Sequence, residues 1–279
     1  MILNLNPNFK PLDGQEISFE AFTFAGGEPH IKILSNIPKQ HSVTITQRIN
    51  SFNDLGLLCL AVDALKRMDV LLQDLYIPYF PAARQDRVMV PGEPLSVKVY
   101  ADIINTLNFK RVLVVDAHSE VTPALINNCE VISNHDFIKT IISDLNEEVV
   151  LISPDGGALK KIYKLSEALG GLEVVECSKS RNVKTGKLSG FKVYANDLAG
   201  RSCLIVDDIC DGGGTFIGLA AELKNKNAGK LYLAVSHGIF SKGFDELSAN
   251  FERIFTTDSI KTADNFRLTQ IKCGYGLLS

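Results

Sequence analysis

The chain has 279 residues, a formal net charge of −3 at pH 7 and 46% hydrophobic residues. This length allows one large or two medium hydrophobic cores. A slightly acidic chain has no overall positive field, which argues against non-specific binding of nucleic acid. No nucleic-acid partner is therefore expected, and any anion must be held by a local site.

Two further features bear on the cellular location. No window approaches the roughly 18 consecutive apolar residues of a membrane span, and residues 1–10 lack the basic and apolar regions of a signal peptide. The six cysteines include no Cys-x-x-Cys pair and mostly lie in apolar surroundings, as reduced thiols do. We therefore expect a soluble, cytoplasmic protein with no membrane partner, no structural disulfide and no zinc.

Short apolar runs alternate with helical patterns along the chain. The predicted strands are residues 42–45, 74–77, 111–115, 149–152, 172–175, 203–206 and 231–235. Apolar residues at helical spacing predict amphipathic helices over 55–68 and 95–107. This alternation is typical of parallel sheets covered on both faces, so the sequence predicts an α/β fold.

The chain is long enough to divide in two. Residues 129–144 carry few strand signals and precede a second series of strand and helix units. We place a boundary near residue 135, with an N-terminal domain over 1–134 and a C-terminal domain over 135–279.

A basic segment lies inside the second predicted domain. Residues 178–190 combine small polar residues with basic ones, among them Lys179 and Arg181, and show no apolar periodicity. This composition predicts a mobile basic loop.

The most informative segment is residues 204–215, where an apolar strand leads into acids and glycines before a helical pattern over 216–223. In order, the polar and glycine positions are Asp207, Asp208, Asp211, Gly212, Gly213, Gly214 and Thr215. Backbone amides at a helix amino end bind phosphate without basic side chains, and glycine permits close approach and positive φ. Paired carboxylates beside an anion suit sugar hydroxyls or a magnesium ion. The segment predicts a site for a phosphorylated sugar, and a glycine-rich turn with solvated aspartates is the alternative.

Three other segments carry candidate site residues. Residues 78–87 read Pro-Tyr-Phe-Pro-Ala-Ala-Arg-Gln-Asp-Arg, with arginines able to pair with phosphates and rings able to stack on a base. Residues 115–119 read Val-Asp-Ala-His-Ser, and residues 153–157 read Ser-Pro-Asp-Gly-Gly. Taken alone, the first segment fits a surface turn held by ion pairs, and the histidine fits a structural role.

These four segments, in this order, resemble the ribose-phosphate pyrophosphokinases, also called PRPP synthetases, from about residue 24 to about residue 260. The resemblance implies two phosphoribosyltransferase-like domains, each a mainly parallel sheet flanked by helices. It also implies an ATP site reached across a subunit interface, and hence a homo-oligomer. The implied reaction is the Mg²⁺-dependent transfer of the β,γ-diphosphate of ATP to the anomeric 1-hydroxyl of ribose 5-phosphate, giving PRPP and AMP.

The resemblance also implies roles by position. ATP would contact Phe24, Glu28, Arg84, Gln85 and Asp86. His118 and Asp155 would hold Mg²⁺, and Lys179 and Arg181 would be the catalytic Lys-x-Arg of a loop that closes over the phosphates. Asp207 and Asp208 would hold the ribose hydroxyls, and the 5-phosphate would be surrounded by Asp211, Gly212, Gly213, Gly214 and Thr215.

Two positions depart from the family pattern. Gly26 replaces the aspartate of the family's Phe-x-Asp-Gly-Glu, which leaves the nucleotide donor open, with GTP as one alternative. Gly212 replaces the threonine of Asp-Thr-Gly/Ala-Gly-Thr. A terminal phosphate there loses a hydrogen bond worth on the order of 1.5 to 3 kcal/mol, whereas a longer 5-substituent gains room. ADP-ribose is therefore an alternative acceptor.

Two other classes are less favoured. A phosphoribosyltransferase that consumes PRPP needs neither the first domain nor the segment 78–87. A regulatory homologue without catalysis would have a degraded catalytic loop or metal site, whereas Lys179, Arg181, His118 and Asp155 are all present.

Overall fold

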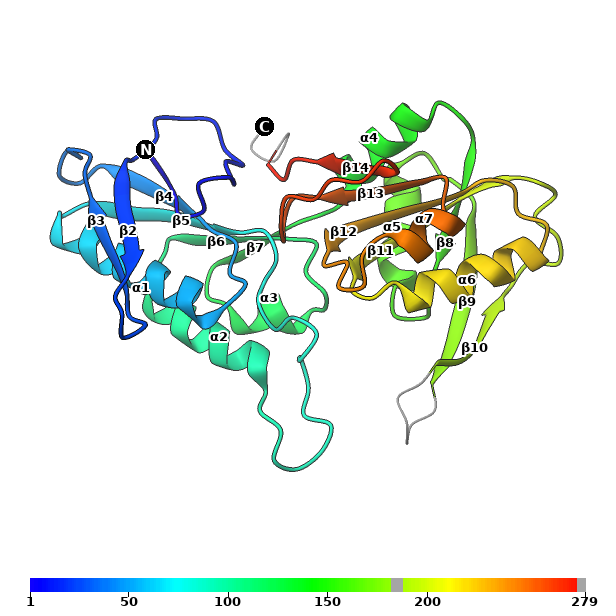
Figure 1. Cartoon of the computed structure of the whole chain (residues 1–279), viewed down its shortest axis with the longest axis horizontal. Helices are drawn as coiled ribbons and strands as arrows, with labels where there is room; N and C mark the ends of the chain where they lie inside the picture. Colours follow the sequence, from blue (N-terminus) through cyan, green and yellow to red (C-terminus); the bar gives the residue numbers. More distant parts are fainter. Residues whose placement is uncertain (182–187, 275–279) are drawn as a thin grey trace. The chain divides into compact units, whose positions relative to one another are not determined.

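The computed structural model describes residues 1–181 and 188–274 (Figure 1). By their contacts, residues Met1–Ser133 form one unit together with the described residues from Lys272 onward, and Asn134–Ile271 form the second. The sequence had assigned everything after residue 134 to the second domain. Cys273 packs instead with Phe9 and Tyr76 of the first unit, because its buried side chain completes an apolar cluster there.

The first unit is built on a parallel sheet with the strand order β1-β4-β5-β6-β7. Its strands are β1 (Ile2–Asn4), β4 (Ser42–Thr46), β5 (Leu71–Ile77), β6 (Arg111–Val115) and β7 (Cys129–Ile132). Its helices are α1 (Phe52–Arg67), α2 (Ser96–Thr106) and α3 (Val121–Leu125). An antiparallel hairpin, β2 (Phe19–Thr23) and β3 (Pro29–Ile33), lies outside this sheet.

The two faces of the first sheet are covered differently. Successive side chains of a strand point to opposite faces. Val112 and Val114 of β6 therefore pack in the cluster that contains α1 and α2, whereas Leu113 and Val115 pack with Phe9. Helices thus cover one face, and the N-terminal segment with Cys273 covers part of the other.

The second unit is built on a sheet with the strand order β10-β9-β8-β11-β12-β13-β14, parallel except for the β9–β10 pair. Its strands are β8 (Val149–Ser153), β9 (Val174–Arg181), β10 (Leu188–Val193), β11 (Ser202–Cys210), β12 (Leu231–Gly238), β13 (Arg253–Thr257) and β14 (Leu268–Ile271). Its helices are α4 (His135–Leu145), α5 (Leu159–Ala168), α6 (Gly214–Asn225) and α7 (Asp245–Asn250).

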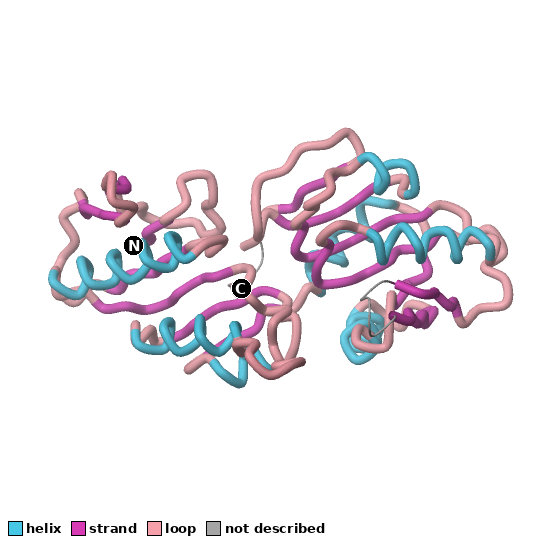
Figure 2. Tube along the Cα trace, turned by 60° about the horizontal axis from the view of Figure 1, so that its bottom comes forward, coloured by secondary structure: helices cyan, strands magenta, loops and turns pink. Residues whose placement is uncertain are grey.

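Helices cover both faces of the second sheet, as the trace in Figure 2 shows. Cys203 and Ile205 of β11 pack with α6 and α7, and the alternate residues Leu204 and Val206 pack with α4 and α5. A strand buried on both faces reads as a continuous apolar run, which is the pattern of residues 203–206. The predicted α/β class with mainly parallel, helix-flanked sheets is confirmed. Within the described residues, every helix is too short or too polar to cross a membrane.

The structure corrects the interpretation of the basic segment. Residues 178–181 continue β9, and residues 188–190 begin β10, which pairs with β9 so that Lys179 lies opposite Phe191. The middle of the predicted loop, 182–187, lies outside the described residues. The polar composition misled because the antiparallel partner strand, rather than apolar alternation, supplies the hydrogen bonds that extend β9.

Candidate active site

Most of the predicted site residues lie at one edge of the second sheet. β8, β11 and β12 are parallel neighbours, so the segments that follow them leave at the same edge. Asp155 follows β8, and residues 211–215 follow β11. β9, parallel to β8, brings Lys179 to this edge. Ligands of open α/β sheets bind at the carboxyl ends of strands, so this edge is the candidate site.

The glycine run connects β11 to helix α6. Gly213 is the N-cap of α6 with φ 78°, and a Cβ at this position would lie 3.0 Å from the side chain of Leu247. The first hydrogen bonds of α6 run from the amides of Phe216 and Ile217 to Gly213 O, at 2.9 and 3.0 Å. The amides of Gly214 and Thr215 come before them and have no acceptor within the helix. They are donors available to an anion, at the positive end of the helix dipole.

Asp207 and Asp208 lie near the end of β11. The amide of Asp208 donates to Asp207 Oδ1 at 2.9 Å. Burial raises the pKa of Asp207 well above its usual value, and the charges of Asp208 and Asp155 raise it further. A carboxyl group held with an unfavourable charge is in a state that ligand hydroxyls or a cation would relieve.

Asp155 joins the start of helix α5 to Lys179. Its Oδ1 accepts hydrogen bonds from the amides of Gly157 (2.8 Å) and Ala158 (3.2 Å). Its Oδ2 forms a close ion pair with Lys179 Nζ, and both side chains are 22% exposed. The carboxylate is therefore fixed in orientation, and the predicted catalytic lysine is held against the predicted metal ligand. The side chain of Arg181 lies outside what the structure describes.

The segment after β12 lies against the glycine run, and sequence reasoning missed it. Ser241 Oγ donates to Asp211 Oδ1 at 2.6 Å, and the Ser241 amide donates to Asp211 O at 3.1 Å. A Cβ on Gly212 would lie 3.3 Å from both Cδ and Cε of Lys242. The available signal was the position of Ser-Lys-Gly directly after a buried strand that neighbours β11.

In the first unit, the structure brings together two segments separated by about thirty residues. Arg87 Nε donates to Asp86 Oδ1 at 3.0 Å. This bond, together with a hydrogen bond from Ser119 and the charge of His118, lowers the pKa of the Asp86 carboxyl, although burial opposes the shift. Asp86 therefore connects the segments 78–87 and 115–119, while Arg84 and Gln85 lie exposed beside it.

Phe24 and Glu28 lie on a different element, the turn between β2 and β3. The Phe24 amide donates to Glu28 O at 2.8 Å, and the rings of Phe24, Phe22 and His30 pack together with centroids 4.8 to 5.6 Å apart. A Cβ on Gly26 would lie 2.6 Å from the Glu28 carboxylate, which therefore occupies the place of a side chain there. Figure 1 draws this turn well apart from the loop after β5 that carries Arg84.

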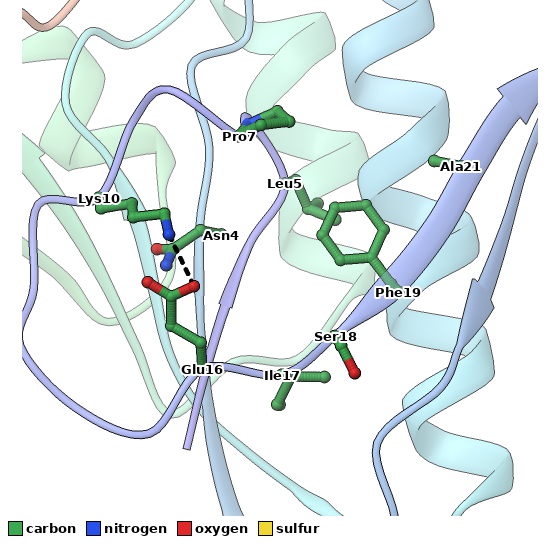
Figure 3. Close-up of a pocket in the computed structure, with 9 residues that line it drawn as sticks. All are labelled: Asn4, Leu5, Pro7, Lys10, Glu16, Ile17, Ser18, Phe19 and Ala21. Carbon is green, nitrogen blue, oxygen red and sulfur yellow. Dashed lines mark hydrogen bonds and ion pairs between the residues drawn. The ribbon is translucent and has the colours of Figure 1, made fainter.

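The first unit also has a cavity of about 520 Å³ that holds none of the predicted site residues. Leu5, Ile17 and Phe19 give it an apolar lining, and the Lys10–Glu16 ion pair (2.8 Å) closes one side (Figure 3). It has no arrangement of charges suited to a phosphate.

The residues fit a magnesium ion through their donor chemistry. Mg²⁺ prefers oxygen ligands and is often held by one or two carboxylates together with substrate phosphates. Asp155 offers an oriented carboxylate oxygen whose partner is a single lysine. Within residues 1–181 and 188–274, no group of three or more His, Cys, Asp or Glu side chains is arranged to hold a metal.

The fold and the aspartate-glycine segment define a protein with phosphoribosyltransferase-like domains. Residues 128–266 match the phosphoribosyl transferase domain, and residues 10–107 match the N-terminal domain of ribose phosphate pyrophosphokinase. The ribose-phosphate pyrophosphokinase of Aquifex aeolicus is 32% identical over 250 residues, which cover 85% of this chain and 78% of that protein. The enzyme of the same name from Mycobacterium bovis is 26% identical over 94% of this chain and 82% of that protein.

A solved structure agrees at the level of the fold. The phosphoribosylpyrophosphate synthetase from Mycobacterium smegmatis superposes with a TM-score of 0.84 at 22% identity, covering 99% of this chain and 95% of that one. The chain belongs to the ribose-phosphate pyrophosphokinase family. It is therefore a transferase of this type, and PRPP synthesis is its activity at the level of the family.

Proposed function

We propose that the protein transfers the β,γ-diphosphate of ATP to the anomeric 1-hydroxyl of ribose 5-phosphate, in a Mg²⁺-dependent reaction that yields PRPP and AMP. The observation that carries the proposal is the segment after β11, in which two carboxylates precede unpaired helix amides on a chain of this family. A bond forms between the anomeric oxygen and the β-phosphorus of ATP. The bond from that phosphorus to the α,β-bridging oxygen breaks, and this oxygen leaves with AMP.

The acceptor is proposed to bind along the carboxyl edge of the second sheet. The 5-phosphate would accept hydrogen bonds from the amides of Gly214 and Thr215 and from the Thr215 hydroxyl, with Asp211, Gly212 and Gly213 shaping the turn. Asp207 and Asp208 would accept hydrogen bonds from the ribose hydroxyls. Hydrogen bonds from these hydroxyls would offset the burial that raises the pKa of Asp207, to which the charges of Asp208 and Asp155 add.

Charge neutralisation is the main demand of diphosphoryl transfer, together with alignment of the attacking oxygen. His118 and Asp155 are the proposed protein ligands of Mg²⁺. The bound ion would neutralise the charge of the phosphate oxygens. Lys179 and Arg181 would stabilise the negative charge that develops on the departing oxygen of AMP. Since this charge appears only in the transition state, their contacts raise turnover more than affinity.

Lys179 has to leave Asp155 before it reaches a phosphate. In the structure its ammonium group pairs with Asp155, the proposed metal ligand. Asp155 would hold the metal through the carboxylate that pairs with Lys179 in the structure. The lysine would therefore have to move from Asp155 to the phosphates.

The nucleotide is proposed to contact Arg84, Gln85 and Asp86 of one copy and Phe24 and Glu28 of another. Phe24 is 52% exposed, and its ring cluster offers an aromatic face to a base. Within one chain the hairpin turn lies away from the loop after β5 (Figure 1), and a site that uses both would be shared between two copies in a homo-oligomer. Light scattering at micromolar concentration would test this, and a monomer that is fully active would contradict it.

A second acceptor is favoured by one observation. Gly212 lacks the threonine side chain typical of the family, so a ribose whose 5-phosphate continues outward, such as ADP-ribose, is the alternative substrate. The reaction would then give the 1-pyrophosphate of ADP-ribose and AMP.

The decisive experiment is AMP release from magnesium-ATP with ribose 5-phosphate and, separately, with ADP-ribose, with products identified by mass. Faster release with ribose 5-phosphate and a PRPP product would support the first acceptor. Turnover with ADP-ribose alone would support the second. Absence of AMP with both, and with GTP as donor, would overturn the proposed reaction.

A further inference from the structure

We propose that Lys242 is a specificity-determining residue that selects acceptors carrying a diphosphate at the ribose 5-position. This inference rests on the second acceptor of the proposed function, ADP-ribose, and it assigns Lys242 to the same acceptor site. Neither the sequence motif nor the family resemblance points to this lysine. It lies in the segment after β12, outside residues 204–215.

The position of Lys242 is fixed by the packing of two loops. Hydrogen bonds join the segment after β12 to the segment after β11, residue by residue. The amides of Ile239 and Phe240 donate to Cys210 O at 2.9 and 3.2 Å, and Ser241 bonds to Asp211 through both its amide and its hydroxyl. The residue before Lys242 is thus tied to the first residue of the glycine loop.

The conformation of this segment adds to the rigidity. Phe240 adopts φ 47°, its ring packs on Phe244 with centroids 4.6 Å apart, and a Cβ on Gly238 would lie 2.1 Å from that ring. The Phe240 side chain therefore anchors the turn. Lys242 projects from a constrained backbone beside the glycine run.

Gly212 and Lys242 fit together as a pair. The lysine stem passes 3.3 to 3.4 Å from the place where a Cβ on residue 212 would be. That separation is tighter than ordinary van der Waals contact, so a threonine at residue 212 would displace the lysine stem. The room opened by Gly212 is thus occupied, and it is occupied by a flexible chain that ends in a cation.

The ammonium group lies at the rim of the loop. Lys242 is exposed, with its stem against Gly212 and its charged end toward solvent, as long basic side chains often are. No hydrogen bond or ion pair connects Lys242 Nζ to residues 1–181 or 188–274. A rim cation with no protein partner is available to a ligand.

Charge placement explains why a diphosphate is selected. A terminal 5-phosphate is met by the amides of Gly214 and Thr215 inside the loop, and the hydroxyl that a threonine at residue 212 would add is missing. A second phosphate continuing outward from the loop carries one more negative charge and passes the rim, where Lys242 supplies the compensating cation. With Gly212 and Lys242, the short neutral hydroxyl donor of a threonine at residue 212 is therefore replaced by the longer, charged ammonium donor of Lys242.

The test compares binding and turnover of two probes, ribose 5-phosphate and ADP-ribose. The variants are Lys242→Met, which keeps the length of the stem without the charge, and Lys242→Gln. Lys224→Met is the matched control, since Lys224 is an exposed lysine in the last turn of α6, the helix that follows the glycine run, and its hydrogen bond goes to Asn250. Calorimetry measures both dissociation constants without ATP, and AMP release measures kcat/KM for each acceptor.

We expect Lys242→Met and Lys242→Gln to weaken ADP-ribose binding by about tenfold to a hundredfold, the worth of a hydrogen bond to a charged group. Binding of ribose 5-phosphate should change less than about twofold, and Lys224→Met should match the parent for both. Gly212→Thr, which displaces the lysine stem and restores a hydroxyl, should shift the preference toward ribose 5-phosphate.

Two results would overturn the inference. They are a ratio of the two dissociation constants that Lys242→Met leaves unchanged, or a parent protein that does not bind ADP-ribose. These are separate from failure of the proposed function, which is absence of AMP with either acceptor in the parent. In that case the calorimetric ratio alone still decides the role of Lys242.

Discussion

The two edges of the second sheet shift the pKa values of their carboxyl groups in opposite directions. At the amino edge, Glu147 accepts hydrogen bonds from Ser202 Oγ (2.6 Å), Tyr232 OH (2.6 Å) and Lys230 Nζ (3.1 Å). These partners lower its pKa to about 2. At the carboxyl edge, burial and neighbouring acids raise the pKa of Asp207.

The difference shows where the unit is stabilised and where it is prepared for a ligand. Glu147 ties together the starts of β8, β11 and β12 with every charge satisfied within the chain. The opposite ends of the same strands hold Asp207 with an unfavourable charge and Gly213 in the left-handed region. Functional sites commonly carry such perturbed pKa values, and the surrounding structure compensates for them.

The largest expected effect tests the carboxyl edge. Lys179→Ala should lower kcat by about a hundredfold to a thousandfold, because removing one donor that stabilises transition-state charge costs that much. The protein should stay folded, since the lysine is a partly exposed side chain at the end of β9. Steady-state AMP release and circular dichroism measure the two quantities.

Lys164→Ala is the control for this variant, because Lys164 is an exposed lysine of α5 in the same unit. It should keep the parental kcat. Unfolding of Lys179→Ala under conditions where the parent is folded would show that the lysine stabilises the fold, as Glu147 does at the amino edge.

Asp207→Asn should make the protein more stable and less active. Below the unfolded pKa, Asp207 is protonated in both states and contributes nothing. As the pH rises through that value, the unfolded state ionises while the folded group keeps its proton, so stability is lost. Removing the charge should therefore raise the free energy of unfolding at pH 7 by about 1 to 3 kcal/mol.

The activity of Asp207→Asn should fall by about tenfold or more, because an amide replaces the carboxyl group that is proposed to contact a ribose hydroxyl. Thermal unfolding and kcat/KM for the acceptor measure the two changes. Asp264→Asn, at an exposed acid, should alter neither. A destabilised Asp207→Asn would contradict the contrast between the two edges.

A pair of glycine variants separates fold from binding within the loop. Gly213→Ala should destabilise the protein by about 1 to 2 kcal/mol, because an alanine is strained at φ 78° and its Cβ meets Leu247. Gly214→Ala should leave stability within about 0.5 kcal/mol, since a Cβ there has no protein atom within 4 Å. It should instead raise KM for the acceptor, because its methyl group enters the proposed phosphate site.

Urea unfolding and acceptor kinetics on both variants provide the measurement. Equal loss of stability in Gly213→Ala and Gly214→Ala would contradict the assignment of Gly213 to the fold and Gly214 to phosphate binding. An unchanged KM in Gly214→Ala would remove its amide from the proposed phosphate site.

The smallest expected effect on catalysis belongs to the amino edge. Glu147→Gln should leave kcat unchanged and lower the free energy of unfolding at pH 7 by about 1 to 3 kcal/mol, because three donors lose a charged acceptor. The folded pKa is depressed, so the contribution of Glu147 is present above the unfolded value of about 4.3. It is lost as the pH falls toward 2.

The stability difference between parent and Glu147→Gln should therefore be constant near neutral pH and shrink in acid. Denaturant unfolding at a series of pH values measures it. A difference that grows toward acid pH would contradict the assignment.

The predicted strands and helices that the structure confirms are those with strong apolar periodicity in their own sequence. The run 111–115 coincides with β6, and the helix predicted over 95–107 is α2 (Ser96–Thr106). Apolar periodicity decides these elements, since each must bury one face or both. The hairpin β2–β3 and the extension of β9 to Arg181 carry weaker patterns, because hydrogen bonds to the adjacent antiparallel strand form them without an alternation of buried side chains.

For the site, the sequence by itself determined which polar residues follow the carboxyl end of each predicted strand. Parallel strands place their carboxyl ends at one edge, so the positions of Asp155 and of residues 207–215 follow from their place after apolar runs. The family likeness also follows from sequence, because the four segments stand in the family's order along the chain.

Only the tertiary structure decided which side chains meet. The ion pair of Asp155 with Lys179, the three donors on Glu147 and the contact of Lys242 with Gly212 each join residues at least twenty-four positions apart. Such contacts depend on strand order in the sheet, in which β8, β11 and β12 are neighbours although long segments separate them in the chain. Local patterns specify the faces of each element, and the order of the strands specifies the neighbours.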